Sequence, residues 1–282
     1  MRKVEHQDGG ICWADGGHLK DLDYADDICL LSDSKEGIEN LTRTLSQEAS
    51  KVGLKINVEK SKGMRLHIND DTAIEVEGRD LEDVDKFTYL GSELRKDGDI
   101  RGDVRIRIGK AGAVFRSLNK LWSNRGVSVA LKIKLFNSLV IPVLLYGAES
   151  WKQLRELENK LRRFESGCLR KILRITWMQH ISEREVRERS GQESIIVKMR
   201  RHRWRYLGHV LRMEPNRLPK QVLNWTPQGS RRRGRPKETY RRTLQRETTR
   251  IGLNMEELEE MAQDRRMSRV STDLWTSVSE ED

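Results

Sequence analysis

The alternation of apolar and polar residues predicts a strand–turn–strand unit near the start of the chain. From Leu19 to Ser32, two apolar stretches flank a polar pair, Asp26 and Asp27, which is the pattern of two short strands joined by a tight turn. An amphipathic helix should follow, because apolar residues then recur at steps of three and four until Gly53 ends the pattern. Strand-like sequence returns between residues 62 and 94.

From Asp99 onward the spacing of apolar residues becomes helical. Residues 103–122 carry their apolar side chains on one face, and residues 129–145 are apolar on most sides, as in a buried helix. Pro142 lies inside this second stretch, so we expect the helix to kink or end there. Further helices are expected over residues 154–175, 194–213, 240–251 and 255–267. The fold class is therefore predicted as α+β: antiparallel strands and a helix to about residue 95, then an all-helical remainder.

The positive charge of the chain is concentrated in one block. The net charge is +10 over 282 residues, but residues 199–250 hold 16 Lys and Arg against three acids, whereas residues 251–282 hold three Arg against nine acids. A basic block of this kind attracts a polyanion such as nucleic acid. Trp204, Tyr206 and Trp225 lie among the arginines and could stack on bases. The alternative is a solvated helical face without a partner.

Several classes of protein are excluded or disfavoured. No apolar run approaches 18 residues, so we expect no membrane-spanning helix, and the N-terminal residues lack the apolar core of a secretory signal. Cys12, Cys29 and Cys168 are too few and too far apart for a disulfide framework. Because His202 and His209 have no cysteine pair near them, no zinc site is expected.

Asp26 and Asp27 are the sharpest chemical signal in the chain. Two adjacent carboxylates at a turn between apolar strands are costly unless something neutralises them. A pair of Mg²⁺ ions, which prefers oxygen ligands, would do so. The alternative is an ordinary hairpin turn, where aspartate is common.

The segment Tyr24-Ala25-Asp26-Asp27 resembles the motif C hairpin of reverse transcriptases. The resemblance continues in chain order at four further places. Residues 53–62 are similar to motif D, residues 87–92 to motif E (the primer grip), residues 139–151 to a thumb-side segment, and residues 205–212 with 233–236 to the C-terminal region of non-long-terminal-repeat retrotransposons. The chain therefore resembles the C-terminal part of such an enzyme over roughly residues 11–250.

This resemblance implies a division of the chain into four regions. These are a partial reverse transcriptase palm (1–95), a helical thumb-like region (96–176), a basic helical extension with a linker (177–250) and an acidic C-terminal helix and tail (251–282).

The resemblance also implies roles for individual residues. Asp26 and Asp27 would bind catalytic Mg²⁺. Lys62 would lie near the incoming dNTP and neutralise phosphate charge or donate a proton, although Lys60 competes for that role and a plain surface lysine is the alternative. Residues Tyr89, Leu90 and Gly91 would form the turn that touches the primer end, or would simply be strand core and turn.

One expected element is missing. In this family a third aspartate, on the motif A strand, completes the metal site, and none of the 23 residues before Tyr24 resembles that strand; Asp8 and Asp15 lie in glycine-rich surroundings. We therefore expect RNA-directed DNA synthesis by the full-length enzyme and none by this chain alone. The alternative function is that of a non-catalytic nucleic-acid-binding remnant, or of a co-opted retroelement protein.

The basic extension is predicted to bind the RNA template and DNA primer, or duplex DNA. Within it, Arg233-Gly234-Arg235-Pro236 resembles an AT-hook core that could enter the minor groove, and the same run could serve nuclear import, with the cytoplasm as the other location. A linker that touches phosphates without sequence preference is the alternative. The predicted nucleic-acid-binding residues are Arg200, Arg201, Arg203, Arg205, Arg231, Arg232, Arg233, Arg235 and Lys237.

Overall fold

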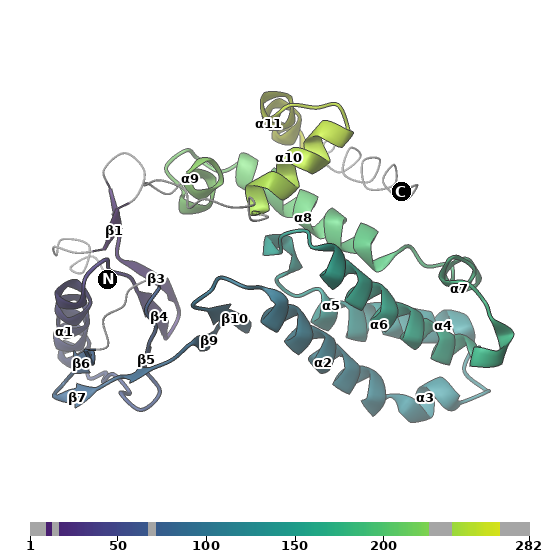
Figure 1. Ribbon diagram of the computed structural model, residues 1–282, viewed down its shortest axis with the longest axis horizontal. Coiled ribbons are helices and arrows are strands. Elements are labelled where there is room, and N and C mark those ends of the chain that lie inside the picture. The colour runs from purple at the N-terminus through teal and green to yellow at the C-terminus, as the bar shows by residue number, and fades with distance from the viewer. Residues whose placement is uncertain (1–9, 13–16, 67–71, 226–238, 266–282) are drawn as a thin grey trace. The chain divides into compact units, whose positions relative to one another are not determined.

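The computed structural model describes residues 10–12, 17–66, 72–225 and 239–265, and the chain divides into two compact units (Figure 1). The first unit is Met1–Ile100 and the second is Arg101–Asp282. In the described residues the strands belong to the first unit and the second is helical, so the α+β class predicted from the sequence is confirmed. No helix in the described part of the chain is long and apolar enough to cross a membrane.

The first unit contains one long helix and five two-stranded ladders. Helix α1 spans Lys35–Lys51. The antiparallel pairs are β1 (Ile11–Cys12) with β2 (His18–Leu19), β3 (Asp21–Tyr24) with β4 (Asp27–Leu30), β6 (Glu75–Val76) with β7 (Arg79–Asp80), and β9 (Lys86–Tyr89) with β10 (Ser92–Arg95). The parallel pair is β5 (Lys62–Gly63) with β8 (Glu82–Asp83).

Helix α1 begins with a side-chain cap and ends at Lys51, just before the glycine that the sequence indicated. The Ser34 hydroxyl accepts a hydrogen bond from the Gly37 amide at 3.1 Å, which satisfies one of the free amides of the first turn. A Cβ at Gly37 would lie within 2.8 Å of that hydroxyl, so the cap requires glycine there. Gly53 has a φ of +77°, which a glycine adopts without strain.

The second unit is built from ten helices in the part of the chain that the structure describes. They are α2 (Arg101–Ser117), α3 (Asn119–Ser123), α4 (Val129–Leu135), α5 (Ile141–Leu144), α6 (Arg155–Leu173), α7 (Glu183–Ser190), α8 (Ile195–Leu211), α9 (Leu218–Asn224), α10 (Tyr240–Arg250) and α11 (Met255–Gln263). From Arg101 onward the chain forms this one unit, which includes most of the region that resembles a thumb, the basic block and the start of the acidic end.

Pro142 is accommodated by a widened helical turn. Between α4 and α5, residues Phe136–Val140 form a π-helical turn, in which the Ile141 amide donates to the Phe136 carbonyl five residues back. A proline donates no backbone hydrogen bond and its ring crowds the carbonyl four residues earlier. The wider turn just before Pro142 relieves that conflict, and α5 ends soon afterwards at Leu144.

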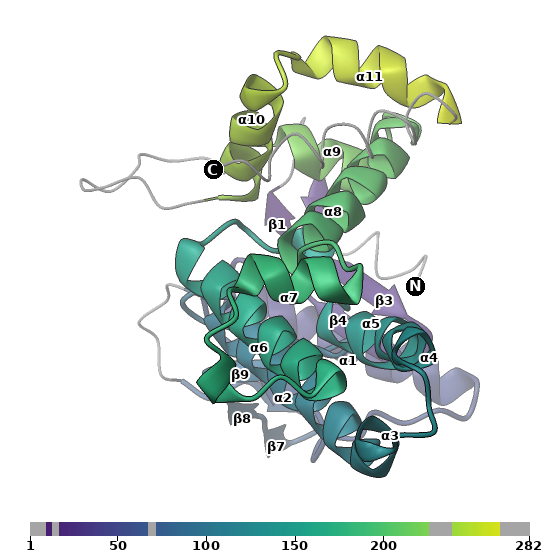
Figure 2. The ribbon, with the colours of Figure 1, turned by 90° about the vertical axis from the view of Figure 1, so that its right-hand side faces the viewer.

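Helix α8 is the centre of the second unit. Both views place α6 on one side of it and α10 with α11 on the other (Figures 1 and 2). The side towards the C-terminal helices is a hydrophobic cluster, in which Trp204, Leu207 and Leu211 of α8 pack with Leu244 of α10 and Leu258 of α11. Polar side chains that α8 buries against its neighbouring helices are costly unless each has a hydrogen-bond or ion-pair partner.

Glu165 of α6 adds to the N-terminal cap of α8, where the Ser194 hydroxyl accepts from the Ile196 amide. Glu165 Oε2 accepts a hydrogen bond from the Ile195 amide at 3.0 Å, while its Oε1 has no hydrogen-bond partner among the described residues. The side chain is buried. Burial raises the pKa of this carboxyl, and the Ile195 amide and the charge of Lys198 oppose that rise only in part.

Replacing Glu165 with glutamine should therefore change how stability depends on pH. A carboxyl whose pKa is higher in the folded state loses stabilising free energy as pH rises from its unfolded value of 4.5 through the raised value. Glu165→Gln should raise the free energy of unfolding at neutral pH by about 1.4 kcal/mol for each unit by which folding raises the Glu165 pKa. The variant should also show a smaller decrease in the free energy of unfolding as pH rises. Chemical unfolding measured across this pH range tests the prediction.

Glu156 on the same helix is the matched control. Lys160 holds the pKa of its exposed carboxyl below the usual value, so Glu156→Gln should give no such gain at neutral pH. Equal behaviour of the two variants at every pH would contradict the role given to Glu165.

Candidate active site and nucleic-acid interface

Asp26 and Asp27 lie at the tip of the β3–β4 hairpin. The strands pair with Tyr24 opposite Asp27, so the turn consists of Ala25 and Asp26 and starts one residue before the polar pair indicated by the sequence. Ala25 has a φ of +57°, which is uncommon for a residue with a side chain. Both aspartates are exposed, so a metal ion or a nucleotide phosphate could reach them from solvent.

The predicted primer-grip residues form the tip of a second hairpin, β9–β10. Tyr89 pairs with Ser92, and Leu90 and Gly91 between them have φ values of +48° and +82°. Positive φ at both central residues is the pattern of a type I′ turn, which matches the natural twist of a hairpin. Leucine is an unfavourable residue for the first of these positions.

Tyr89 connects the two hairpins. Its hydroxyl donates a hydrogen bond to the Leu22 carbonyl of β3 at 3.0 Å. Burial raises the pKa of the Tyr89 hydroxyl, and the Cys29 thiol and the carboxylates of Asp27 and Asp23 raise it further. The residue at the predicted primer end is therefore held beside the strands that present the two aspartates.

Lys62 is engaged within its own part of the first unit. Its Nζ donates to the Glu59 carbonyl at 3.1 Å and forms an ion pair with Glu82 of the neighbouring strand β8. Both partners belong to the surroundings of β5 rather than to the β3–β4 hairpin. Lys62 would have to leave Glu82 before it could contact a nucleotide phosphate.

Within residues 10–12, 17–66, 72–225 and 239–265, no three His, Cys, Asp or Glu side chains gather as a metal site. Asp26 and Asp27 supply two carboxylates, and Mg²⁺ commonly completes its shell with waters and substrate phosphates. Their chemistry fits Mg²⁺ as part of a larger set of oxygen ligands. Asp8 and Asp15 lie outside the described residues.

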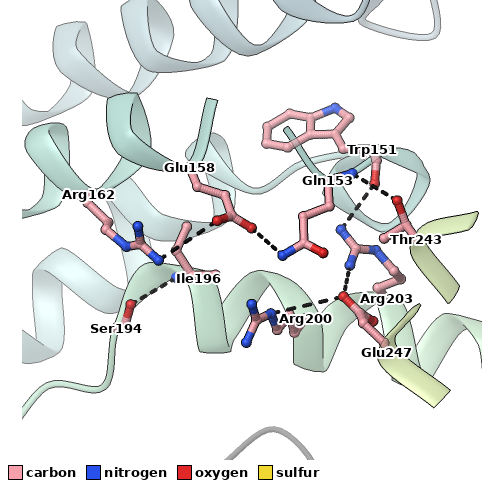
Figure 3. Close-up of polar contacts among 10 residues, drawn as sticks. All are labelled: Trp151, Gln153, Glu158, Arg162, Ser194, Ile196, Arg200, Arg203, Thr243 and Glu247. Carbon is pink, nitrogen blue, oxygen red and sulfur yellow. Dashed lines mark hydrogen bonds and ion pairs between the residues drawn. The ribbon is translucent and has the colours of Figure 1, made fainter. Parts of the chain in front are cut away.

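Arg200 and Arg203, two of the arginines expected to contact nucleic acid, are buried inside the second unit. The side chain of Arg203 is 0% exposed; it pairs with Glu247 of α10 and donates to the Trp151 carbonyl at 3.1 Å (Figure 3). Nε of Arg200 lies 4.0 Å from the same Glu247 carboxylate. A guanidinium buried beside its counter-charge is not available to a phosphate.

Further hydrogen bonds anchor α10 beside this pair (Figure 3). Thr243 Oγ1 accepts from the Gln153 amide at 3.0 Å, and the Gln153 side chain donates to Glu158 at 2.8 Å. The Trp151 indole donates to Asp103 of α2 at 2.9 Å. The segment around Trp151 therefore connects α2, α8 and α10 by polar contacts.

The remaining predicted arginines are in different situations. Arg201 forms a two-point ion pair with Glu193, at 2.6 and 2.7 Å, and is half-buried, while Arg205 is exposed. The other five positions lie outside the described residues; they are Arg231, Arg232, Arg233, Arg235 and Lys237. Sequence reasoning missed Glu247, the only acid of α10.

Arg203 and Arg205 make a direct test of the buried pair. Arg203→Ala should lower the free energy of unfolding by about 3–5 kcal/mol, because it leaves the Glu247 carboxylate buried without its main partner. Arg205→Ala removes an equal charge from an exposed position of the same helix and should change stability by less than about 0.5 kcal/mol. Urea denaturation of the two variants measures the difference, and equal losses would contradict the assignment.

Leu90 provides a test of the second hairpin. Leu90→Asn creates the Asn-Gly pair that type I′ turns favour and should stabilise the hairpin by up to about 1 kcal/mol. Slower hydrogen exchange of the β9 and β10 amides would report this gain. Unchanged or faster exchange would show that the turn does not have the assigned conformation.

Comparison with known proteins shows which families and relatives these features resemble. Residues 15–94 match the family model described as reverse transcriptase (RNA-dependent DNA polymerase). The chain is also similar to an uncharacterized transposon-derived protein of Caenorhabditis elegans, with 26% identity over 220 residues that cover 75% of this chain and 78% of the relative. No solved structure matches the chain. The matched segment holds the β3–β4 hairpin and all but the last residue of the β9–β10 hairpin, so over residues 15–94 the chain is similar to reverse transcriptases.

Proposed function

We propose that the chain is the C-terminal portion of a non-long-terminal-repeat retrotransposon RNA-directed DNA polymerase. One observation carries the proposal: the hairpin that presents Asp26 and Asp27 is held by Tyr89 to the hairpin of Leu90 and Gly91, within the segment that matches the family. The proposal is supported because Tyr89, a residue of the expected primer grip, contacts the hairpin that carries the expected metal ligands.

Different residues of the first unit would have different roles in the reaction. Asp26 and Asp27 would hold Mg²⁺, which supplies charge stabilisation to the dNTP phosphates when it is bound. The turn at Leu90 and Gly91 would touch the primer end opposite the RNA template. Lys62 would exchange Glu82 for a phosphate, since a phosphate carries more charge than a single exposed carboxylate.

The proposal includes no DNA synthesis by this chain alone. In the described residues Asp26 and Asp27 gather no third metal-ligating side chain, and in-line transfer needs a more complete set of ligands. The missing carboxylate would come from outside the described residues. We also propose a nuclear location, which suits a basic protein that acts on nucleic acid.

Mg²⁺-dependent binding of dNTP is the test of the proposed site. The chain should bind a fluorescent dNTP in the presence of Mg²⁺ and lose that binding when the metal is chelated. Asp26→Asn should weaken it by at least about tenfold, the effect of roughly one charge-assisted contact. Asp80→Asn, at an exposed position of the same unit, should not.

Primer extension on an RNA template tests whether the chain alone synthesises DNA. We expect no extension by the chain alone; dNTP incorporation that disappears in Asp26→Ala would overturn the proposed inactivity and support the polymerase site. The absence of Mg²⁺-dependent dNTP binding, or its persistence in Asp26→Asn, would contradict the polymerase proposal and favour a non-catalytic nucleic-acid-binding protein.

A further inference from the structure

Helix α10 has two faces of opposite chemistry. Its buried positions are Thr243, Leu244, Glu247 and Thr248. Its exposed positions recur with the helical period and are Arg241, Arg242, Gln245, Arg246, Thr249 and Arg250. The only acid of the helix is thus turned inward, and its four arginines are turned outward.

The buried pair explains why the arginines face outward. Glu247 contacts Arg203 and Arg200 of α8, and Thr243 accepts from Gln153, so two positions one turn apart fix the rotation of α10 about its axis. Leu244 packs into the cluster shared with α8 and α11. With this face held against α8, the arginine face must point to solvent.

We infer that the outer face of α10 binds the phosphate backbone of a nucleic acid. Arg242, Arg246 and Arg250 are spaced four residues apart, so each step advances about 6 Å along the helix. The three arginines thus form a regular row of positive charge that can follow a phosphate backbone. Guanidinium groups also suit phosphate because they offer several donors in a fixed plane.

The composition of the exposed face favours nucleic acid over a membrane or an acidic protein. The positions between the arginines are Gln245 and Thr249, which can donate hydrogen bonds to phosphate and sugar oxygens. An amphipathic membrane helix would expose apolar residues there, and the core of a protein interface would contain them as well. In the sequence, the basic run from Arg231 to Lys237 directly precedes this helix.

The acidic helix α11 follows α10 but part of its charge is engaged elsewhere. Glu257 accepts from the Asn254 amide in a capping box, and Glu259 pairs with Lys220 of α9. These two carboxylates therefore stabilise the C-terminal helices.

This inference rests on the proposed nucleic-acid function and locates its binding surface. Its test is the affinity of the full chain for fluorescent duplex DNA and for an RNA–DNA hybrid, measured between about 50 and 200 mM salt. Arg246→Gln together with Arg250→Gln should weaken binding by at least about tenfold and lower the log–log salt slope by roughly 1.8, since each lost phosphate contact contributes about 0.9 on B-DNA.

The matched control is Arg184→Gln together with Arg189→Gln on α7. These arginines are exposed like those of α10 but lie on another helix, where they pair with Glu188 and Glu185. The control removes the same charge and should leave affinity and slope nearly unchanged. Equal losses in both double variants would overturn the inference, because net charge rather than α10 would then control binding.

Two further measurements distinguish this inference from its alternatives. Unaltered binding in the α10 variant, or binding to anionic lipid vesicles in place of both nucleic-acid probes, would also overturn the inference. Asp80→Asn, at an exposed position of the first unit outside the proposed site, should leave the affinity for the probes unchanged. Loss of Mg²⁺-dependent dNTP binding with intact α10-dependent binding therefore distinguishes failure of the polymerase proposal from failure of this one.

Discussion

The second unit depends on one buried ion pair, Arg203 of α8 with Glu247 of α10. Two charges removed from water cost several kcal/mol each, and only close geometry with additional hydrogen bonds repays that cost. Here the Trp151 carbonyl accepts from the guanidinium and Arg200 adds a second positive charge near the carboxylate. Burial raises the pKa of Glu247 and the arginines oppose that rise, so the carboxylate depends on its partners to stay ionised.

The pair also sets which basic residues remain available for function. Arg203 and Arg200 belong to the block whose charge pointed to nucleic acid, yet they act as interior anchors for α10. Because the same contacts fix the rotation of α10, they turn its own arginines outward. The described part of the basic block therefore has two kinds of residue: some hold the helices together, and others are exposed on the outer face of α10. The first unit, by contrast, keeps its two key carboxylates exposed.

The sequence predicts the elements better than it predicts the role of each charge. The hairpin at Asp26 and Asp27, the helix that ends at Gly53 and the disturbance at Pro142 all follow from local rules, because turns, caps and prolines act on neighbouring residues. The burial of Arg203 depends on Glu247, which is 44 residues away, and no local rule connects the two.

A signal for that burial is nevertheless present in the sequence. Ile196, Arg200, Arg203 and Leu207 follow steps of four, three and four, so the two arginines lie on the apolar stripe of α8 rather than opposite it. The count of positive charge over a block hides this difference, because it ignores the face on which each residue lies. Lys62 is a similar case, since its contact with Glu82 depends on the parallel pairing of β5 with β8.

A double-mutant cycle at Arg203 and Glu247 tests the central claim most directly. Arg203→Met and Glu247→Leu should each be strongly destabilising alone, because each leaves one buried charge unpaired. The double variant should recover much of the loss, with an interaction free energy of about 2–3 kcal/mol from urea denaturation. Additive effects of the two substitutions would show that the pair is not what anchors α10 against α8.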